Sequence, residues 1–240
     1  MKRTVLVTGG NKGIGFYTAQ KFLACGDSVI IAGRNAKRLE AACQSLGLPQ
    51  SSFVVWDVSD ENCAEERLEE ASRIYGAIDV FCNNAGVLTE ADWKNDFFQV
   101  TPDAWDMTIN TNLKGLFFAC QGEANYFIRQ KRKGHIVNVC SELSFRGVYA
   151  PYGISKWGAR GLTAGLGKLL GRYGITVNGV APGSTATGMV HWDEKQGLDS
   201  GCPRGVMAKP EEIAELIYFL AGADNIVGEI VVSDGGSRLH

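Results

Sequence analysis

The stretch VLVTGGNKGIGFYTAQKFLA, residues 5–24, decides the fold of this 240-residue chain. An apolar run at 5–7 is followed by glycines at 9, 10, 13 and 15, and then by a segment whose apolar residues have helical spacing. A strand, a glycine turn and a helix in this order place free backbone N–H groups and the positive end of the helix against an anion. The stretch therefore predicts a turn that binds the pyrophosphate of a nucleotide.

The glycine spacing is Gly9-x-x-x-Gly13-x-Gly15. It differs from the GxGxxG pattern of many dinucleotide-binding turns and from the GxxxxGK(S/T) pattern of phosphate-binding NTPases. Taken alone, the segment is also compatible with an ordinary glycine turn before a helix.

Short apolar runs alternate with longer segments of helical periodicity along the whole chain. The expected strands are 4–8, 28–32, 53–56, 78–82, 135–140, 175–180 and 229–232, and the expected helices include 14–24, 36–46, 60–75, one that begins at Thr101-Pro102, and 210–222. This alternation predicts one α/β domain over residues 1–240, with a doubly wound parallel sheet of about seven strands and helices on both faces. Loops 87–101 and 183–209 are expected to line the ligand crevice at the carboxyl ends of the strands.

Composition argues against several classes of function. The formal charge of -2 gives no field that would gather nucleic acid or an anionic membrane. The apolar run near the N-terminus is too short for a signal peptide or a membrane span, so a cytoplasmic location is expected. Seven scattered cysteines without a CxxC pair, and three histidines without ligand spacing, argue against a disulfide framework and against a metal site.

Further motifs follow the glycine turn in a fixed order: TGGNKGIG from Thr8, NNAG at 83–86, Asn112 within NTNLKG, Ser141, YGISK at 152–156, and NGVAPGSTAT from Asn178. This ordered set resembles the short-chain dehydrogenase/reductase family in its compact single-domain form, and the resemblance runs from residue 4 to residue 236. It implies a Rossmann-like fold and hydride transfer between NADP(H) and a carbonyl or secondary alcohol.

Tyr152 and Lys156 are suited to the proton transfer that must accompany hydride transfer. Four residues apart on a helix, they share one face. A nearby ammonium favours the phenolate form of a tyrosine, whose pKa is ordinarily about 10. The pair therefore predicts that Tyr152 acts as an acid and base near neutral pH.

The resemblance assigns four catalytic roles. Tyr152 exchanges the proton, Lys156 also holds the nicotinamide ribose, Ser141 hydrogen-bonds the substrate oxygen, and Asn112 positions a water for proton supply. Ser141 and Tyr152 are separated by 11 positions, about two fewer than the family leads us to expect. In this shortened loop Ser144 is the weaker alternative to Ser141.

The cofactor is expected to contact several segments. By resemblance, Asp57 meets the adenine edge, and the segment from Pro182 to Thr187 contacts the carboxamide of nicotinamide. Asp57 could equally cap the turn that follows it, with Ser59 and Asp60. The predicted cofactor-binding residues are Gly9, Asn11, Lys12, Gly13, Ile14, Gly15, Arg34, Asp57, Val58, Asn84, Ala85, Gly86, Tyr152, Lys156, Pro182, Gly183, Thr185 and Thr187.

Arg34 and Lys12 predict NADP(H) over NAD(H). In a site selective for NAD, an acidic residue about 20 residues beyond the glycine turn binds both ribose hydroxyls. Here Gly33 and Arg34 hold that place. A guanidinium can bind the 2′-phosphate of NADP with paired, charge-assisted hydrogen bonds, and Lys12 adds a second positive charge.

The leading interpretation is an NADP(H)-dependent carbonyl reductase or alcohol dehydrogenase, with a homotetramer implied by the resemblance. One alternative is a nucleotide-sensing protein that keeps the fold without turnover. Another is a sugar-nucleotide epimerase or dehydratase, which the short segment after the last strand disfavours. An apolar or cyclic substrate is expected from side chains on the two loops and beside them: Leu88, Trp93, Phe97, Phe98, Tyr149, Met189, Val190 and Trp192.

Overall fold

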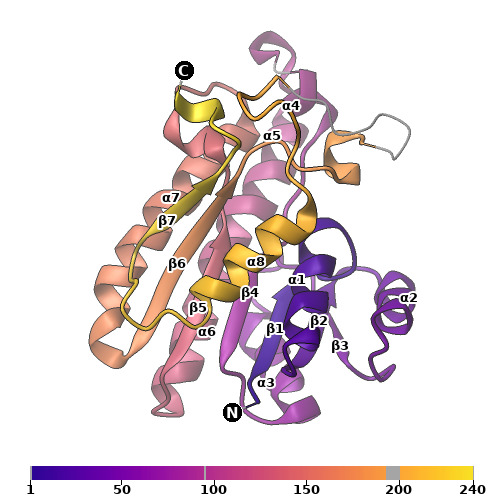
Figure 1. Ribbon diagram of the computed structural model, residues 1–240, viewed down its shortest axis with the longest axis vertical. Helices are drawn as coiled ribbons and strands as arrows, with labels where there is room; N and C mark the ends of the chain where they lie inside the picture. Colours follow the sequence, from indigo (N-terminus) through magenta and orange to yellow (C-terminus); the bar gives the residue numbers. More distant parts are fainter. Residues whose placement is uncertain (1, 95, 193–200, 240) are drawn as a thin grey trace.

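The computed structural model describes residues 2–94, 96–192 and 201–239. Its centre is a parallel sheet of seven strands in the order β3-β2-β1-β4-β5-β6-β7 (Figure 1). The strands are β1 Thr4–Thr8, β2 Ser28–Gly33, β3 Phe53–Val55, β4 Val80–Asn83, β5 Gly134–Val139, β6 Ile175–Pro182 and β7 Ile230–Ser233. The strand order reverses where β1 pairs with β4, which in this kind of sheet opens a crevice at the carboxyl ends. The predicted doubly wound sheet is confirmed.

Helices cover both faces of the sheet (Figure 1). One face carries α1 Gly13–Ala24, α2 Ala36–Leu46 and α8 Pro210–Leu220, which pack on one set of strand side chains. The opposite face carries α3 Ala64–Tyr75, α6 Gly115–Arg129 and α7 Pro151–Leu170. Across the described ranges, every helix is too short or too polar to span a lipid bilayer.

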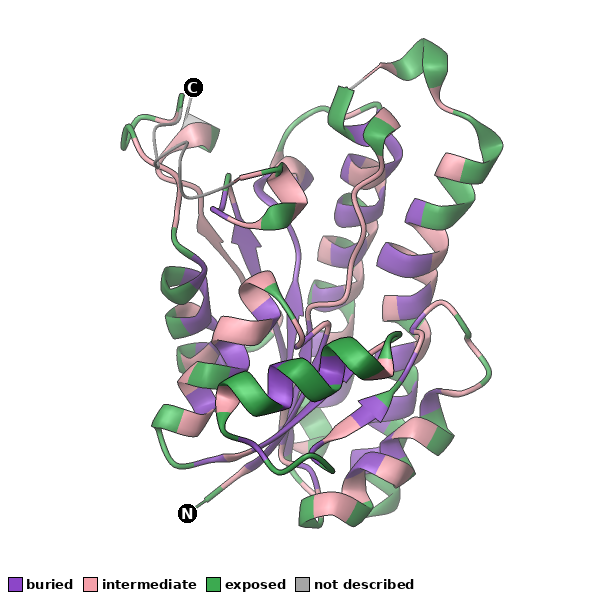
Figure 2. Cartoon of the chain, turned by 90° about the vertical axis from the view of Figure 1, so that its right-hand side faces the viewer, coloured by how far each residue is buried: buried purple, intermediate pink, exposed green. Residues whose placement is uncertain are grey.

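The core consists of two apolar layers, one on each side of the sheet. Along β1, Leu6 packs into the layer under α3 and α6, whereas Val5 and Val7 pack into the layer under α1 and α8. Because side chains alternate between the faces of a strand, a strand covered on both sides reads as a continuous apolar run. The central strands are accordingly buried along most of their length (Figure 2).

Shorter elements lie between the main helices and strands. They are α4 Glu90–Lys94, α5 Pro102–Ile109, the π-helix η2 Asn110–Lys114, and the 3-10 turns η1 Phe97–Gln99, η3 Glu142–Phe145, η4 Gly171–Tyr173, η5 Gly188–Val190 and η7 Ser237–Leu239. Part of the predicted loop 183–209, residues 193–200, lies outside the described residues.

The expected helix 60–75 begins only at Ala64. Asp57 accepts hydrogen bonds from the backbone N–H and the hydroxyl of Ser59, and Asp60 accepts one from the N–H of Asn62. Aspartate side chains that bond to nearby backbone groups compete with helix formation. The acidic start of this segment therefore forms turns.

The helix expected from residue 102 is divided in two. Thr101 caps it as predicted, accepting a hydrogen bond from the N–H of Ala104. After α5, the chain makes a π turn that contains Asn112, and α6 starts at Gly115. A Cβ at Gly115 would lie 2.4 Å from the carbonyl oxygen of Val58, so the glycine permits close contact with the segment after β3.

Candidate active site

The glycine turn between β1 and α1 is fixed by its neighbours. Gly9 and Gly13 have φ angles of 65° and 53°, in the left-handed region that glycine adopts readily. A Cβ at Gly15 would lie 2.4 Å from both the carbonyl oxygen of Gly9 and the Nδ2 of Asn84. That same Nδ2 donates to the carbonyl oxygens of Thr8 and Gly9, so the asparagine holds the turn in shape.

Helix α1 opens toward this turn with Lys12 at its N-cap position. A lysine side chain has no acceptor to offer the first N–H groups of the helix. These donors and the positive end of the helix are therefore suited to an anionic ligand, as a pyrophosphate would be.

A cavity of about 470 Å³ lies beyond the glycine turn. Most of its wall comes from residues predicted to bind the cofactor: Gly9, Asn11, Lys12, Arg34, Asp57, Val58, Ala85 and Gly86. The wall also contains Arg38, which the sequence analysis did not select, together with Trp56 and Thr111. Three cationic side chains, Lys12, Arg34 and Arg38, thus line one cavity, which suits a phosphate group in addition to the pyrophosphate.

Asp57 lies in this wall but is already engaged. Its Oδ1 accepts from the N–H of Ser59 at 3.0 Å and from the hydroxyl of Ser59 at 2.7 Å. Asp57 therefore caps the turn that follows it, as the alternative interpretation predicted. Its other oxygen, Oδ2, is the one that could accept a hydrogen bond from an adenine edge.

A second, narrower cavity of about 90 Å³ continues from Gly86, which lines both. Its wall brings together the second half of the predicted set: Ile14, Asn84, Gly86, Ser141, Tyr152, Lys156, Pro182, Gly183, Thr185 and Thr187. Gly13 and Gly15 stand behind the walls and shape the turn. The two cavities together form a path that runs from the cationic side chains to the Lys156–Tyr152 pair. Backbone lies close on both sides of this path, which suits a dinucleotide in an extended conformation.

Tyr152 and Ser141 meet at the end of this path. Their side chains hydrogen-bond to one another, and the Oγ of Ser141 also accepts from the N–H of Leu143 at 3.2 Å. Ser144 is fully buried and donates to the Ser141 carbonyl oxygen. The shortened loop therefore still places Ser141 beside Tyr152 and turns Ser144 away.

Lys156 is buried one helical turn further along α7. Its Nζ donates to the carbonyl oxygen of Val139 at 2.7 Å, and burial lowers its pKa. Asn112 lies nearby, with Oδ1 accepting from the N–H of Val87 and Nδ2 donating to the Val87 carbonyl, both at 2.8 Å. The amide of Asn112 thus secures the start of the loop after β4, and a water could use only the remaining lone pair of Oδ1.

The protonation of Tyr152 differs from the expectation. Burial, with further contributions from Asp92 and Glu142, raises the pKa of Tyr152 to about 12, against the lowering effect of the Ser141 hydrogen bond. The Nζ of Lys156 lies 5.6 Å from the centre of the ring. Loss of water around the phenol is the largest of these effects, so the neutral phenol is the stable form in this structure.

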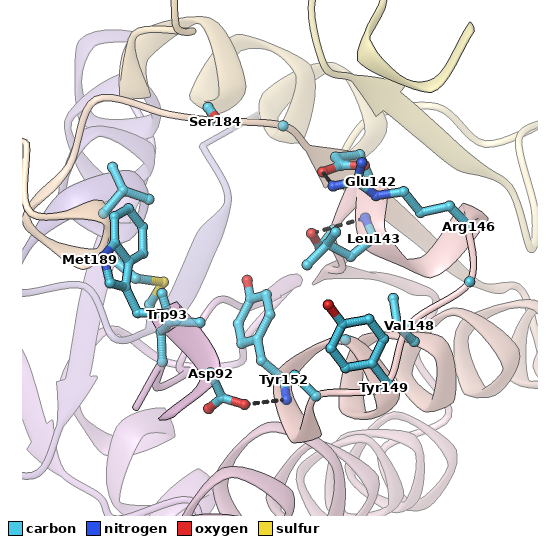
Figure 3. Close-up of a pocket in the computed structure, with 17 residues that line it drawn as sticks. Asp92, Trp93, Glu142, Leu143, Arg146, Val148, Tyr149, Tyr152, Ser184 and Met189 are labelled. Carbon is cyan, nitrogen blue, oxygen red and sulfur yellow. Dashed lines mark hydrogen bonds and ion pairs between the residues drawn. The ribbon is translucent and has the colours of Figure 1, made fainter. Parts of the chain in front are cut away.

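The largest opening beside Tyr152 is a cavity of about 450 Å³ (Figure 3). Its wall includes Leu88, Trp93, Tyr149, Met189 and Val190, as expected, but also Glu142 and Arg146, which pair at 2.9 Å. Phe97 and Phe98 lie outside it, in a shallow groove with Tyr149, and Trp192 lies beyond η5. The wall is therefore mixed, because it combines apolar side chains and aromatic rings with an ion pair.

The comparisons with known proteins agree with this arrangement. The family model described as short chain dehydrogenase matches residues 3–197. The chain belongs to the short-chain dehydrogenase family. The 3-oxoacyl-(acyl-carrier-protein) reductase of Chlamydia trachomatis is 34% identical over 246 residues, which cover 98% of this chain and 97% of the relative. The acetoacetyl-CoA reductase of an Acinetobacter strain is 33% identical over 250 residues, covering 100% and 99%.

Solved structures of the family superimpose closely. Actinorhodin polyketide ketoreductase, in a variant solved with NADPH, has a TM-score of 0.86 at 27% identity and covers 100% of this chain and 98% of its own. Levodione reductase has a TM-score of 0.88 at 29% identity, covering 99% and 98%. Membership in the short-chain dehydrogenase family confirms the Rossmann-like fold and the oxidoreductase class, and the predicted cofactor agrees with the NADPH-bound neighbour.

Some residues of this short-chain dehydrogenase site were missed from the sequence. Arg38 lies in the first turn of α2, shortly after Arg34, and lines the same cavity, so its place close to the predicted cation was a usable signal. Glu142 and Arg146 follow Ser141 within the shortened loop, but their pairing depends on the 3-10 turn η3. Within the described ranges, no three acidic, histidine or cysteine side chains gather as a metal ion would require.

Proposed function

We propose that the chain is an NADPH-dependent reductase that converts a carbonyl group to a secondary alcohol, with Tyr152 as the proton donor. The observation that carries the proposal is the position of Tyr152, which lines both the narrow end of the cofactor path and the 450 Å³ cavity. A substrate carbonyl in the larger cavity would find the Tyr152 hydroxyl and the Ser141 hydroxyl together. NADPH, when bound along the path, supplies the hydride.

Each residue of the site has a definite task in this proposal. Ser141 hydrogen-bonds the carbonyl oxygen and orients it, and Tyr152 gives that oxygen a proton as negative charge develops there. Lys156 has N–H groups to spare beyond the one bound to Val139, and these are suited to ribose hydroxyls. Asn112 keeps residue 87 in place at the edge of the cofactor path.

The raised pKa of Tyr152 sets the protonation state in which the residue would begin a reduction. A phenol with a pKa of about 12 is protonated throughout the neutral range, so the group is ready to donate. Donation leaves a phenolate at Tyr152, which the hydrogen bond of Ser141 stabilises.

The cations Lys12, Arg34 and Arg38 support NADPH over NADH. A 2′-phosphate carries about two negative charges and would meet three positive side chains, whereas NADH offers only hydroxyls there.

For the substrate, the proposal names only a chemical class, a compound with a carbonyl group. The rings of Trp93 and Tyr149 suit an apolar or cyclic group, and the Glu142–Arg146 pair suits a polar substituent.

A ketone panel tests the proposal. The full chain is incubated with NADPH and with open-chain, cyclic and 3-oxoacyl ketones, and NADPH consumption is followed. Tyr152→Phe, measured on the same panel, should retain less than about a tenth of the turnover while binding NADPH within a few-fold. Tight NADPH binding without turnover on any ketone would instead favour the nucleotide-sensing alternative, and a fully active Tyr152→Phe would contradict the proposed donor.

The proposal also includes one catalytic domain over residues 1–240, a cytoplasmic location and a homotetramer. Support for assembly comes from an exposed apolar groove along α6 and α7, whose wall includes Phe117, Ile128, Leu162, Leu166, Leu169 and Tyr173. Exposed apolar patches of this kind mark contact surfaces in many proteins. A monomeric mass by light scattering at micromolar concentration would contradict the assembly.

A further inference from the structure

Helix α7, which carries Tyr152 and Lys156, begins with residues that cannot cap it. Ala150 stands at the N-cap position, and alanine offers no acceptor. Pro151 follows, and proline has no N–H. The first backbone donor of the helix is therefore the N–H of Tyr152 itself. Its acceptor is the Oδ1 of Asp92, at 2.8 Å, from a residue sixty positions earlier in the chain (Figure 3).

The second carboxylate oxygen of Asp92 also accepts hydrogen bonds. Its Oδ2 accepts from the N–H of Thr89 at 3.1 Å, from the hydroxyl of Thr89 at 2.7 Å and from the hydroxyl of Thr108 at 2.9 Å. Only 7% of Asp92 is exposed, and Thr108 is fully buried. One carboxylate thus joins α4, α5 and the first turn of α7, where its negative charge also complements the helix end.

We propose that Asp92 is a positioning residue for the Tyr152 hydroxyl and couples it to the wall of the substrate cavity. This inference rests on the proposed function, in which Tyr152 is the proton donor. The next residue, Trp93, faces the cavity on the side opposite Tyr149 (Figure 3). A substrate that presses on Trp93 acts on the same short helix that holds the start of α7. Because proton transfer is sensitive to displacements of about 1 Å, this connection bears on the rate of catalysis.

The chemistry of the site requires a carboxylate. Each oxygen of Asp92 accepts from a backbone N–H, that of Tyr152 on one side and that of Thr89 on the other. A threonine hydroxyl can turn round and accept, but a backbone N–H can only donate. An asparagine has one acceptor oxygen, so its NH2 group would face one of these two N–H donors. Asp92→Asn therefore loosens either α7 or α4 with almost no change in volume.

The charge of Asp92 provides a second readout. The charged and polar groups around Tyr152 are Lys156 on α7, Cys140 and Ser141 after β5, Glu142 on η3, and Asp92 on α4. Among them Asp92 raises the pKa of Tyr152. Loss of this charge lowers that pKa, so the alkaline limb of the reduction rate should move to lower pH. A residue that served stability alone would leave the limb in place.

The test uses the full chain with NADPH and the best ketone of the panel. Asp92→Asn should lower kcat by about 10- to 100-fold, keep the KM for NADPH within about threefold, and shift the alkaline limb of kcat to lower pH. The matched control is Asp106→Asn, which removes one charge from the exposed side of α5 and should leave kcat and the limb unchanged. Wild-type kcat together with an unmoved limb in Asp92→Asn would overturn the proposal.

A second variant covers the case in which Asp92→Asn does not fold. Thr108→Val keeps the carboxylate and its charge but removes one hydrogen bond at its back. It should lower kcat severalfold without moving the alkaline limb, and an unchanged kcat would overturn the positioning role. Different results would reject the proposed proton donor and the proposed role of Asp92. An active Tyr152→Phe rejects the proton donor, whereas an inactive Tyr152→Phe beside an unaffected Asp92→Asn rejects only the role of Asp92.

Discussion

The Nζ of Lys156 lies 5.6 Å from the centre of the Tyr152 ring and donates to the carbonyl of Val139. The lysine is thereby anchored at the end of β5, and it lines the narrow cavity that Gly86 and Thr187 help to form. Its contribution to cofactor binding is therefore expected to be at least as large as its effect on the tyrosine.

Replacement of this lysine should affect two measurements together. Lys156→Ala removes ribose-binding donors and the positive charge near the phenol, so both NADPH affinity and kcat should fall by about tenfold or more. Fluorescence titration with NADPH and steady-state rates check this. Lys168→Ala, at an exposed position of the same helix, is the matched control. A variant with wild-type NADPH affinity would show that Lys156 does not bind the cofactor.

Cofactor preference is expected to follow the three cations. We expect kcat/KM with NADPH to exceed that with NADH by at least about tenfold, which corresponds to roughly 1.4 kcal/mol. Arg34→Ala and Arg38→Ala should each reduce the preference, because each removes a charge from the wall of the cavity. Lys37→Ala, between them in sequence but outside that wall, should not. Equal efficiency with the two cofactors in the wild type would contradict this assignment.

The reverse change in preference is also testable. Gly33→Asp combined with Arg34→Ser should shift the preference toward NADH, because it replaces a cation with the acid that binds ribose hydroxyls. A Cβ at Gly33 would lie 3.2 Å from the Oδ1 of Asn11, so a movement of Asn11 by a few tenths of an ångström accommodates it. Measured kcat/KM ratios for the double variant decide the outcome.

The titration of Tyr152 is expected above the ordinary range. Its pKa of about 12 means that the phenol stays protonated as pH rises through 10, the ordinary tyrosine value. The ultraviolet difference between the wild type and Tyr152→Phe should therefore show no tyrosinate from this residue below pH of about 10. A signal that titrates near neutral pH would instead support the original expectation from the Tyr152–Lys156 spacing.

Glu123 should make folding stability depend on pH. This carboxyl group is buried on α6 and accepts a hydrogen bond from Asn83 at 2.9 Å, while its Oε1 has no partner among the described residues. Burial raises the pKa of Glu123 to about 8. Between about pH 4, where an unfolded glutamate loses its proton, and pH 8, the folded chain binds the extra proton, so its free energy of unfolding falls as pH rises.

Glu123→Gln should remove this dependence. The amide is neutral at every pH, so the variant gains stability relative to the wild type as pH rises from 5 to 8, by an amount on the order of 4 kcal/mol at most. Thermal unfolding at both pH values measures it, with Glu40→Gln at an exposed position of α2 as the control. A constant difference in Tm across this range would show that the Glu123 carboxyl does not hold a proton in the folded chain.

Local patterns were sufficient to predict the sheet and many of the residues that line the two connected cavities. The strands followed from apolar runs, and the glycine turn, the residues after β4 and the Tyr152–Lys156 spacing each identified a segment at the carboxyl ends of strands. The wrong expectation concerned the pKa of Tyr152. Spacing on a helix shows which groups are near one another, but it does not show how much water surrounds them, and here burial raises the pKa.

Residues that act through distant partners could not be predicted in this way. The role proposed for Asp92 depends on a hydrogen bond to a residue sixty positions later. In the sequence, Thr89 and Asp92 look like an ordinary pair that caps a helix, so the distant contact is hidden. The π turn at Asn112 was likewise not predicted from the residues around it. It depends on packing against Gly86 and Val87, which belong to another part of the chain.

The fixed glycine turn has a consequence for the history of such chains. Gly15 fits against Gly9 and Asn84 within the protein itself, so natural selection for folding alone preserves it even where no nucleotide is bound. A descendant that lost catalysis would keep Gly9 and Gly15 for as long as it kept the shape of this turn. Among descendants of this chain, pseudoenzymes would therefore be distinguished by substitutions at Tyr152 and Lys156, while their glycine pattern stayed intact.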